Sequence, residues 1–213
     1  MTTGPVDDTY DGVEPFPRLG AVVLTGGTGS RMGGADKAGL EVGGHTLLER
    51  ALTAVSQAAE IVVVGDEVPT RHPVVWTRED PPGGGPAAGL LAGIDAFTAP
   101  PDLVVVLAVD MPRVTAATVA RLVWSVKDAI SDGALLVDRD GNAQTLCAVY
   151  RYNALALARP PDRTDEHGLP VRALVGSMLL LEVGATGPEA QDVDTWADLE
   201  QARTDLPGGP STS

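Results

Sequence analysis

Residues 103–110, LVVVLAVD, are apolar up to Asp110, and Pro112 follows two positions later. A run this short, rich in β-branched side chains and without a polar face, is typical of a strand that is buried on both sides. Such burial requires helices on both faces of the sheet to which the strand belongs. This one segment therefore predicts an α/β protein.

The rest of the chain alternates apolar runs with helical patterns in the same way. Further strands are expected at 21–26, 61–65, 74–77, 133–138, 144–151 and 178–183. Helices are expected at 46–57, 87–98, 115–129, 151–159, 169–176 and 195–204. The alternation predicts an α/β fold with a single-domain, three-layer sandwich: a mostly parallel sheet with helices on both faces.

The two ends of the chain lack a periodic pattern. We expect a flexible leader at 1–18, the folded domain at 19–204 and a flexible tail at 205–213. No charged segment leads into an apolar one as in a signal peptide, and no apolar run approaches the roughly 20 residues that cross a bilayer. A cytoplasmic protein without membrane contact is expected.

The chain is strongly acidic, with a formal net charge of −14 and a pI of about 4.4. A surface of this sign repels nucleic acid and anionic lipid, so neither is expected as a partner. An anionic substrate would need a local cluster of cations or a metal ion. The single cysteine, Cys147, lies among apolar residues and is expected to be a buried hydrophobe rather than a catalytic thiol.

A glycine-rich loop follows the first expected strand. Five glycines accompany Arg31 and Lys37 within residues 24–37. Glycines let the backbone approach an anion closely, and the two cations add the charge that a triphosphate needs. A P-loop is excluded because no glycine precedes Lys37 and Ala38 stands where the hydroxyl should be. A dinucleotide fingerprint is excluded because Met32 occupies its third glycine position.

Asp110 ends the most apolar strand, where open α/β sheets bind their ligands. A carboxylate at this edge would point into the same crevice as the glycine loop. Magnesium takes few protein carboxylates and completes its shell with water and phosphate oxygens. A turn cap is the alternative role for Asp110, but the cationic loop opposite favours a metal ligand.

These residues resemble a known family. Residues 24–37 resemble the LxGGxxxRMGxxDK signature of the NTP-transferase superfamily, especially the molybdenum cofactor guanylyltransferases. Four later segments resemble the family's D…GPLAG, DMP, QPxxAxY and DxDTPEDL elements: residues 80–90, 110–112, 144–150 and 192–199. The resemblance runs in order from about residue 20 to residue 203 and implies a Rossmann-like sheet.

The resemblance also implies a role for each matching residue. Arg31 and Lys37 would bind the triphosphate and, with Asp110, form the catalytic set. Asp110 and Asp192 would hold Mg²⁺ as cofactor, with Asp194 nearby. The base and ribose would lie against Leu24, Thr25, Gly26, Gly27, Asp80, Gly85 and Pro86.

The implied reaction transfers GMP from GTP, or another NTP, to the phosphate of a molybdopterin-type acceptor with release of pyrophosphate. A phosphate monoester has a second pKa of about 6, so this nucleophile is already ionised and needs no catalytic base. The resemblance also allows transient contact with proteins that handle the cofactor.

Some positions depart from the family pattern. Thr25, Ala87 and Thr145 stand where Ala, Leu and Pro are usual. Asp192 and Asp194 replace the asparagines that guanylyltransferases commonly carry and resemble the cytidylyltransferase branch. Three alternatives therefore stay open: cytidylyl transfer to molybdopterin, guanylyl transfer to another phospho-acceptor, and a non-catalytic paralogue that only binds nucleotide.

Overall fold

The computed structural model describes residues 16–26 and 36–206. Gly27, Arg31, most of the expected leader and nearly all of the expected tail lie outside these residues. The main strands are β1 (Leu19–Leu24), β4 (Glu60–Val64), β5 (Val75–Thr77), β6 (Leu103–Ala108), β7 (Gly133–Val137), β8 (Ala143–Arg151) and β9 (Leu180–Gly184). The α-helices are α1 (Leu47–Ala54), α2 (Pro86–Asp95), α3 (Ala116–Lys127), α4 (Tyr152–Ala158), α5 (Val171–Leu174) and α6 (Trp196–Asp205).

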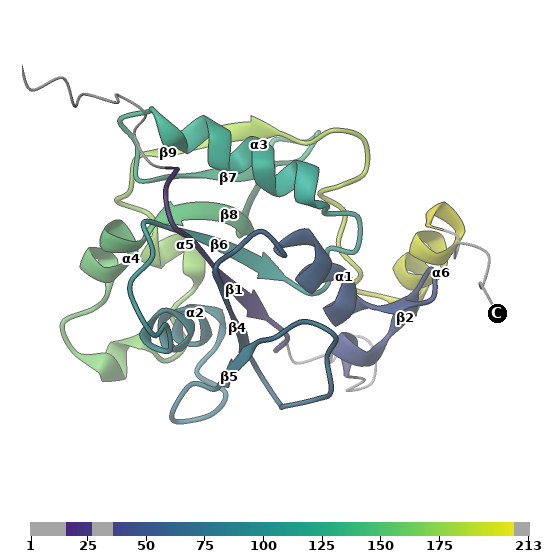
Figure 1. The fold of residues 1–213 in the computed structure, drawn as a ribbon, viewed down its shortest axis with the longest axis horizontal. Coiled ribbons are helices and arrows are strands. Elements are labelled where there is room, and N and C mark those ends of the chain that lie inside the picture. The colour runs from purple at the N-terminus through teal and green to yellow at the C-terminus, as the bar shows by residue number, and fades with distance from the viewer. Residues whose placement is uncertain (1–15, 27–35, 207–213) are drawn as a thin grey trace, which may run out of the picture.

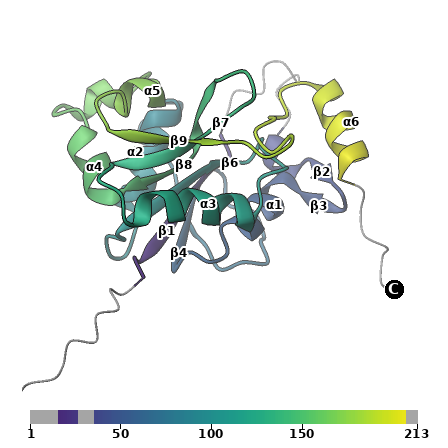
Figure 2. The same ribbon diagram turned by 90° about the horizontal axis from the view of Figure 1, so that it is seen from above.

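The seven main strands form one sheet in the order β5-β4-β1-β6-β8-β7-β9 (Figure 1). Every neighbouring pair is parallel except the two that involve β8, which runs antiparallel to both β6 and β7. Helices α2, α4 and α5 cover one face of the sheet, and α1 and α3 cover the other (Figure 2). The prediction of a three-layer, mostly parallel α/β fold is confirmed.

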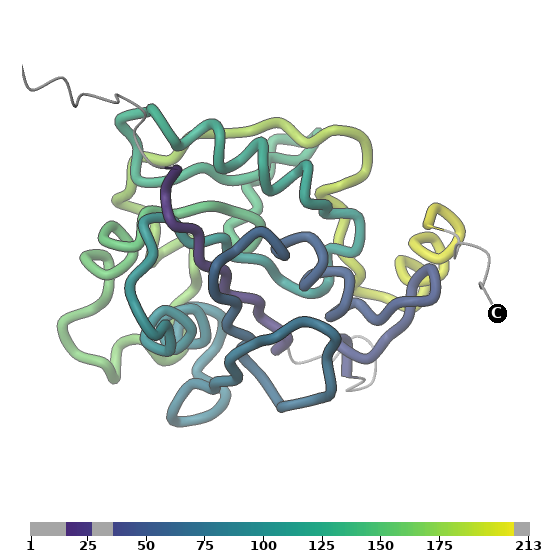
Figure 3. Tube along the Cα trace, in the orientation of Figure 1, coloured from purple at the N-terminus to yellow at the C-terminus, as the bar shows by residue number. Residues whose placement is uncertain are grey.

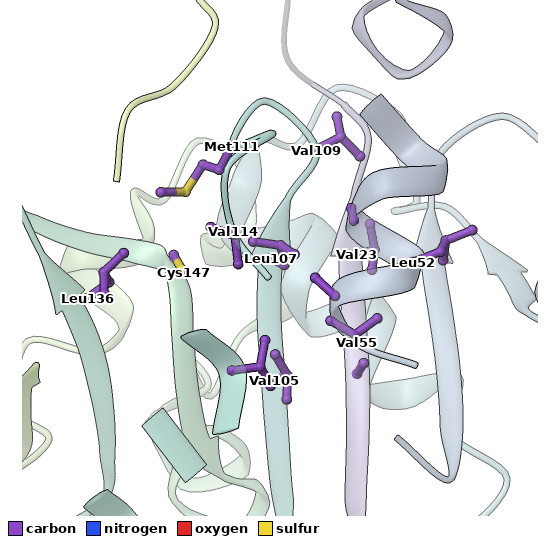
Figure 4. Close-up of a cluster of buried hydrophobic side chains, with 14 of the residues drawn as sticks. Val23, Leu52, Val55, Val105, Leu107, Val109, Met111, Val114, Leu136 and Cys147 are labelled. Carbon is purple, nitrogen blue, oxygen red and sulfur yellow. The ribbon is translucent and has the colours of Figure 1, made fainter. Parts of the chain in front are cut away.

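Alternate side chains of β1 enter two separate cores. Ala21 and Val23 face the core beneath α1 and α3, part of which Figure 4 shows, whereas Val22 and Leu24 face the core beneath α2. Both cores are almost entirely aliphatic, as the scarcity of aromatic residues implies, with Tyr150 as their largest fully buried side chain. Cys147 is also buried, which raises the pKa of its thiol to about 12 and agrees with the predicted structural role.

Threonines begin three of the helices. The hydroxyl oxygens of Thr46, Thr115 and Thr195 each accept a hydrogen bond from the backbone N–H three residues later. This satisfies N–H groups that have no partner inside the helix. These starts lie within one residue of the predicted ones, but α2 ends at Asp95 rather than 98, and α5 is shorter than the predicted 169–176.

A short hairpin, β2 (Glu41–Val42) and β3 (His45–Thr46), precedes α1 and was not predicted. Gly43 and Gly44 form its turn with φ of 62° and 77°, the left-handed values that a tight hairpin turn requires. Arg203 in α6 donates from Nε to the carbonyl oxygen of Glu41 at 3.0 Å. This bond holds α6 beside the hairpin, as Figure 1 also shows. Among the described residues, no helix is long and apolar enough to cross a membrane.

Helix α2 approaches β1 very closely at Gly93. A Cβ atom on Gly93 would lie 2.5 Å from Cγ1 of Val22, which is fully buried in the centre of the sheet. Packed cores accommodate extra atoms only by moving side chains or backbone. The glycine therefore sets the distance between α2 and the sheet, and with it the position of the segment that leads into α2.

We expect Gly93→Ala to lower the free energy of unfolding by about 1–3 kcal/mol, because overpacking outweighs the gain in helix propensity. The measurement is urea unfolding followed by circular dichroism. Gly184→Ala is the matched control, since a Cβ at this exposed position meets no atom of residues 16–26 or 36–206 within 4 Å. Equal stability of the two variants would contradict the proposed packing.

Candidate active site

The ends of β1 and β6 lie side by side at the carboxyl edge of the sheet. The N–H of Val109 donates to the carbonyl oxygen of Leu24 at 3.1 Å. This bond fixes the segment that follows β6 relative to the end of β1. The carbonyl oxygen of Asp110 accepts from the N–H of Val193 at 2.7 Å. The segment that leads to α6 is thereby held against the end of β6. Figure 3 shows these segments, distant in sequence, reaching the same side of the molecule.

Lys37 lies between two of the carboxylates that converge at this edge. Its Nζ donates to Oδ1 of Asp194 at 2.8 Å and to Oδ2 of Asp110 at 3.3 Å. The lysine begins a short 3₁₀ turn, Lys37–Gly39, which Asp36 caps by accepting from the N–H of Ala38. Only 11% of the Lys37 side chain is exposed. The structure thus brings Lys37 and Asp110 into contact.

The charges at this edge shift one another's pKa values. Burial raises the pKa of the Asp110 carboxyl above its usual range, and the charge of Lys37 opposes this only in part. Desolvation, followed by the negative charges of Asp194 and Asp110, also raises the pKa of Asp192. Burial alone would lower the pKa of Lys37, but its bonds and charge contacts with Asp194 and Asp110 hold that pKa above its usual value. The edge therefore carries more negative charge than one lysine neutralises.

The donor set at this edge fits a hard divalent cation. Asp110 and Asp192 interact through their charges, and carboxylate oxygens are the ligands that magnesium prefers. Across the described part of the chain, no three acidic, histidine or cysteine side chains are close enough to hold a metal ion by themselves. A cation here would need oxygen ligands from a bound phosphate and from water as well.

Thr25 ties the end of β1 to the end of β4. Its N–H and its hydroxyl both donate to the carbonyl oxygen of Val64, at 3.1 and 2.9 Å. A Cβ atom on Gly65 would lie 1.9 Å from the Thr25 hydroxyl oxygen, so this position requires glycine. The Thr25 N–H is therefore already used within the protein. Gly26, in contrast, is exposed, and a Cβ atom there would meet no atom of the described residues within 4 Å.

The segment before α2 forms a tight turn. Gly85 precedes the helix with φ of 87°, a left-handed value that favours glycine, and Pro86 is the first helical residue. Glu79 Oε1 accepts from the N–H of Gly83 at 3.0 Å. Asp80 is exposed and lines a cavity of about 280 Å³ along α2. Leu24, Gly26 and Gly85 do not line this cavity.

A second cavity, of about 730 Å³, opens beside Asp192. It lies between the β7–β8 turn, the segment that follows β9 and the start of α6, and sequence reasoning did not find it. Its lining includes Gln144, Asp192 and Asp198, whose places in the QPxxAxY and DxDTPEDL resemblances were sequence signals for it. Most of its other polar side chains come from turns that no periodic pattern distinguishes.

The carboxylates lie beyond the carboxyl ends of parallel strands in an open α/β sheet, and proteins of this class bind their ligands at that edge. Residues 21–177 match the family described as MobA-like NTP transferase domain. That match covers well over half of the chain. The chain therefore belongs to the MobA-like NTP transferase family.

Individual relatives agree with this assignment. The chain is 34% identical over 185 residues to the "Probable molybdenum cofactor guanylyltransferase" of Opitutus terrae, covering 84% of this chain and 90% of that one. It is 32% identical to the protein of the same name from Chloroflexus aggregans, covering 72% of this chain and 75% of that one.

Solved structures share the fold. The crystal structure of molybdopterin-guanine dinucleotide biosynthesis protein A from Archaeoglobus fulgidus has a TM-score of 0.68 at 21% identity, covering 87% of this chain and 97% of that one. The 2-C-methyl-D-erythritol 4-phosphate cytidylyltransferase of Thermus thermophilus has a TM-score of 0.60 at 22% identity, covering 87% and 98%.

We expect Lys37→Met to raise the pKa of the Asp110 carboxyl further. The substitution removes a positive charge and a hydrogen-bond donor, both of which lower that pKa, and leaves the burial that raises it. The measurement is a carboxyl-carbon NMR titration of the protein with labelled aspartate.

Lys127→Met is the matched control, because Lys127 lies on α3 against Phe16 and Trp124, away from this edge. An Asp110 pKa that stays constant or falls in Lys37→Met would show that the lysine does not stabilise the charged form of this carboxyl.

Proposed function

We propose that this protein transfers GMP from GTP to the phosphate of molybdopterin and releases pyrophosphate. The observation that carries the proposal is the convergence of Lys37 with Asp110 and Asp194 at the carboxyl edge, beside the exit of β1. Similarity to proteins named molybdenum cofactor guanylyltransferase supports this choice of nucleotide and acceptor. The expected contact with cofactor-handling proteins stays a prediction.

The acceptor's phosphate oxygen would attack the α-phosphorus of the nucleotide. Its bond to phosphorus forms as the bond to pyrophosphate breaks, with the attacking and leaving oxygens in line. The phosphate is already ionised, so no protein base removes a proton. Lys37 would leave its carboxylate partners to neutralise charge on the phosphates, aided by Arg31, and the site would act mainly through position and charge.

We further propose that Mg²⁺ binds at this edge, held by Asp110 and Asp192 with Asp194 nearby. Their carboxylates would supply few of its ligands, and the triphosphate and water would supply the rest. Such an ion would supply positive charge that stabilises the phosphates and holds them in position. The hydrogen bond from the Val193 N–H to the Asp110 carbonyl oxygen holds the two segments that carry these carboxylates next to each other.

Cytidylyl transfer is the alternative with an observation in its favour. Asp192 and Asp194 form the acidic pair that resembles the cytidylyltransferase branch, and the Thermus thermophilus cytidylyltransferase shares the fold. Few side chains near the expected position of the base have polar groups that distinguish one base from another. The residues expected there are Leu24 to Gly26 and Asp80 to Pro86. Base choice would then depend mainly on backbone groups, among which the N–H of Thr25 is already engaged.

The first experiment measures pyrophosphate release with molybdopterin, Mg²⁺ and each of the four NTPs in turn. We expect release with GTP and none above background with the other three. Release with CTP alone would show that the protein transfers CMP rather than GMP. Binding of a nucleotide without release in any mixture would contradict the proposal and favour another acceptor or a non-catalytic paralogue.

The second experiment tests the metal ligand. We expect Asp110→Asn to lower kcat by about 100-fold or more, because a weakened metal site loses several kcal/mol of charge stabilisation in the transition state. Much of the GTP binding, measured by calorimetry, should remain. Asp128→Asn is the matched control at an exposed position after α3. Turnover of Asp110→Asn at the wild-type rate would show that Asp110 is not a metal ligand.

A further inference from the structure

Glu189 is a buried carboxylate that the proposed reaction does not use. It lies in the segment between β9 and α6, a few residues before Asp192, and is only 7% exposed. It is not part of the lining of the cavity beside Asp192. Withdrawing a carboxylate from water is costly unless hydrogen bonds and an opposite charge compensate. The contacts of Glu189 therefore show what its burial stabilises.

Each carboxylate oxygen of Glu189 accepts two hydrogen bonds. Oε1 accepts from the backbone N–H of Thr186 at 2.6 Å and from Nη2 of Arg121. Oε2 accepts from the hydroxyl of Thr118 at 2.7 Å and from Nη1 of Arg121 at 3.4 Å. The Thr118 hydroxyl oxygen itself accepts from the N–H of Thr115 at 3.2 Å, which leaves its hydrogen for Glu189. Both oxygens are thus satisfied by donors from the protein.

These bonds keep Glu189 ionised. Burial alone would raise the pKa of its carboxyl, but the bonds from Arg121, Thr186 and Thr118 hold that pKa below its usual value. The group is therefore charged at neutral pH, and its hydrogen bonds are of the stronger, charge-assisted kind. An amide in its place would put an NH2 group against two donors in either orientation of the side chain. Glu189→Gln therefore breaks the contact with little change in shape.

The contact joins a helix to a connecting segment. Thr118 and Arg121 lie on α3, which packs against β7, β8 and β9. Thr186 and Glu189 lie between β9 and α6, in a segment that passes α3 on its way to α6 (Figure 1). Connecting segments are usually among the more mobile parts of a fold. Glu189 therefore fixes to α3 a piece of chain that belongs to no strand or helix.

A second anchor follows at Val193. This residue is fully buried, and its N–H donates to the carbonyl oxygen of Asp110 at 2.7 Å. Asp192 lies between the two anchors, so its backbone is held to α3 through Glu189 and to the end of β6 through Val193. Without Glu189, the segment that leads to Asp192 would lose these bonds to α3.

We infer that Glu189 is a positioning residue, which holds Asp192 at the carboxyl edge by fixing the segment before it to α3. The inference rests on the proposed function, in which Asp192 is a ligand of the magnesium ion. Protein carboxylates supply few ligands of such an ion, so displacement of one of them weakens its binding. Small displacements of groups at a reacting centre also lower rates strongly. Glu189 thus acts on the reaction through the position of Asp192.

Amide hydrogen exchange, followed by NMR without nucleotide or metal, tests the anchor directly. We expect Glu189→Gln to accelerate exchange at Val193 by about tenfold or more, because hydrogen bonds to a charged group contribute enough to shift a local opening equilibrium by this factor. Arg121→Met removes only the guanidinium, from a side chain that is 37% exposed, and so leaves the folding of the core intact. It should accelerate exchange at Val193 as well, by a smaller factor.

Glu60→Gln is the matched control. Oε1 of Glu60 accepts from the N–H and the hydroxyl of Thr98 at 2.9 and 2.8 Å, and its Oε2 pairs with Nη2 of Arg18 at 3.6 Å. This contact has the same kinds of donor as that of Glu189, but Glu60 begins β4 at the opposite edge of the sheet. We expect wild-type exchange at Val193 in this variant. Equal acceleration in Glu60→Gln and Glu189→Gln, or wild-type exchange at Val193 in Glu189→Gln, would overturn the anchor.

Pyrophosphate release at increasing Mg²⁺ tests the consequence for Asp192. We expect Glu189→Gln to raise the Mg²⁺ concentration for half-maximal release by about tenfold, because one of few protein ligands is displaced. The KM for GTP at saturating Mg²⁺ should stay within about twofold of the wild-type value, because the residues expected to bind base and ribose lie on other segments. Glu60→Gln should leave both quantities unchanged.

The two measurements separate this inference from the proposed reaction. Accelerated exchange at Val193 with an unaltered Mg²⁺ dependence would overturn the role of Glu189 in the reaction, although the anchor itself would stand. Absence of release by the wild type from every NTP would overturn the proposed reaction, and with it this role, while the exchange rates would still show whether Glu189 anchors the segment.

Discussion

The contact of one ammonium group with two carboxylates organises the edge of the sheet where the site lies. Lys37, Asp110 and Asp194 belong to three segments that are distant in sequence, and their charges draw these segments together. In a chain with a net charge of −14, this contact places one positive charge among the carboxylates of the edge. It also concentrates negative charge beyond what Lys37 can neutralise, as the raised pKa values of Asp110 and Asp192 indicate. A metal ion would compensate for this excess.

The order of the strands places different groups on the two sides of this contact. Because β1 and β6 are parallel neighbours, their carboxyl ends lie side by side. The hydrogen bond from Val109 to Leu24 holds these ends in register. Thr25 extends the same alignment to β4 through two bonds to Val64. On the other side, β8 and β7 bring polar turns toward Asp192. The order of strands thus separates the expected nucleotide from the cavity, with the carboxylates between them.

The sequence predicted the sheet and most helices because apolar periodicity and threonine caps are local signals. It could not predict that β8 runs antiparallel, since a buried strand has the same pattern in either direction. The Gly43–Gly44 hairpin was also missed, because its strands are too short to show a period. Lys37 and Asp110 could be named from spacing and resemblance. The bonds of Thr25, the contact of Asp194 with Lys37 and the cavity around Gln144 depend on long-range packing, which no local pattern encodes.

The reversed direction of β8 has a consequence for how such a protein can diversify. The parallel strands have their carboxyl ends at this edge. The amino end of β8 lies here instead, directly after the turn that joins it to β7. Residues can be inserted into or removed from an exposed hairpin turn without shifting the pairing of the strands that flank it. The wall of the cavity can therefore change its height and chemistry over generations while Asp110, β6 and the opposite wall stay in place. The turn between β7 and β8 is thus a place where substitutions and insertions alter the cavity without altering the carboxylate edge.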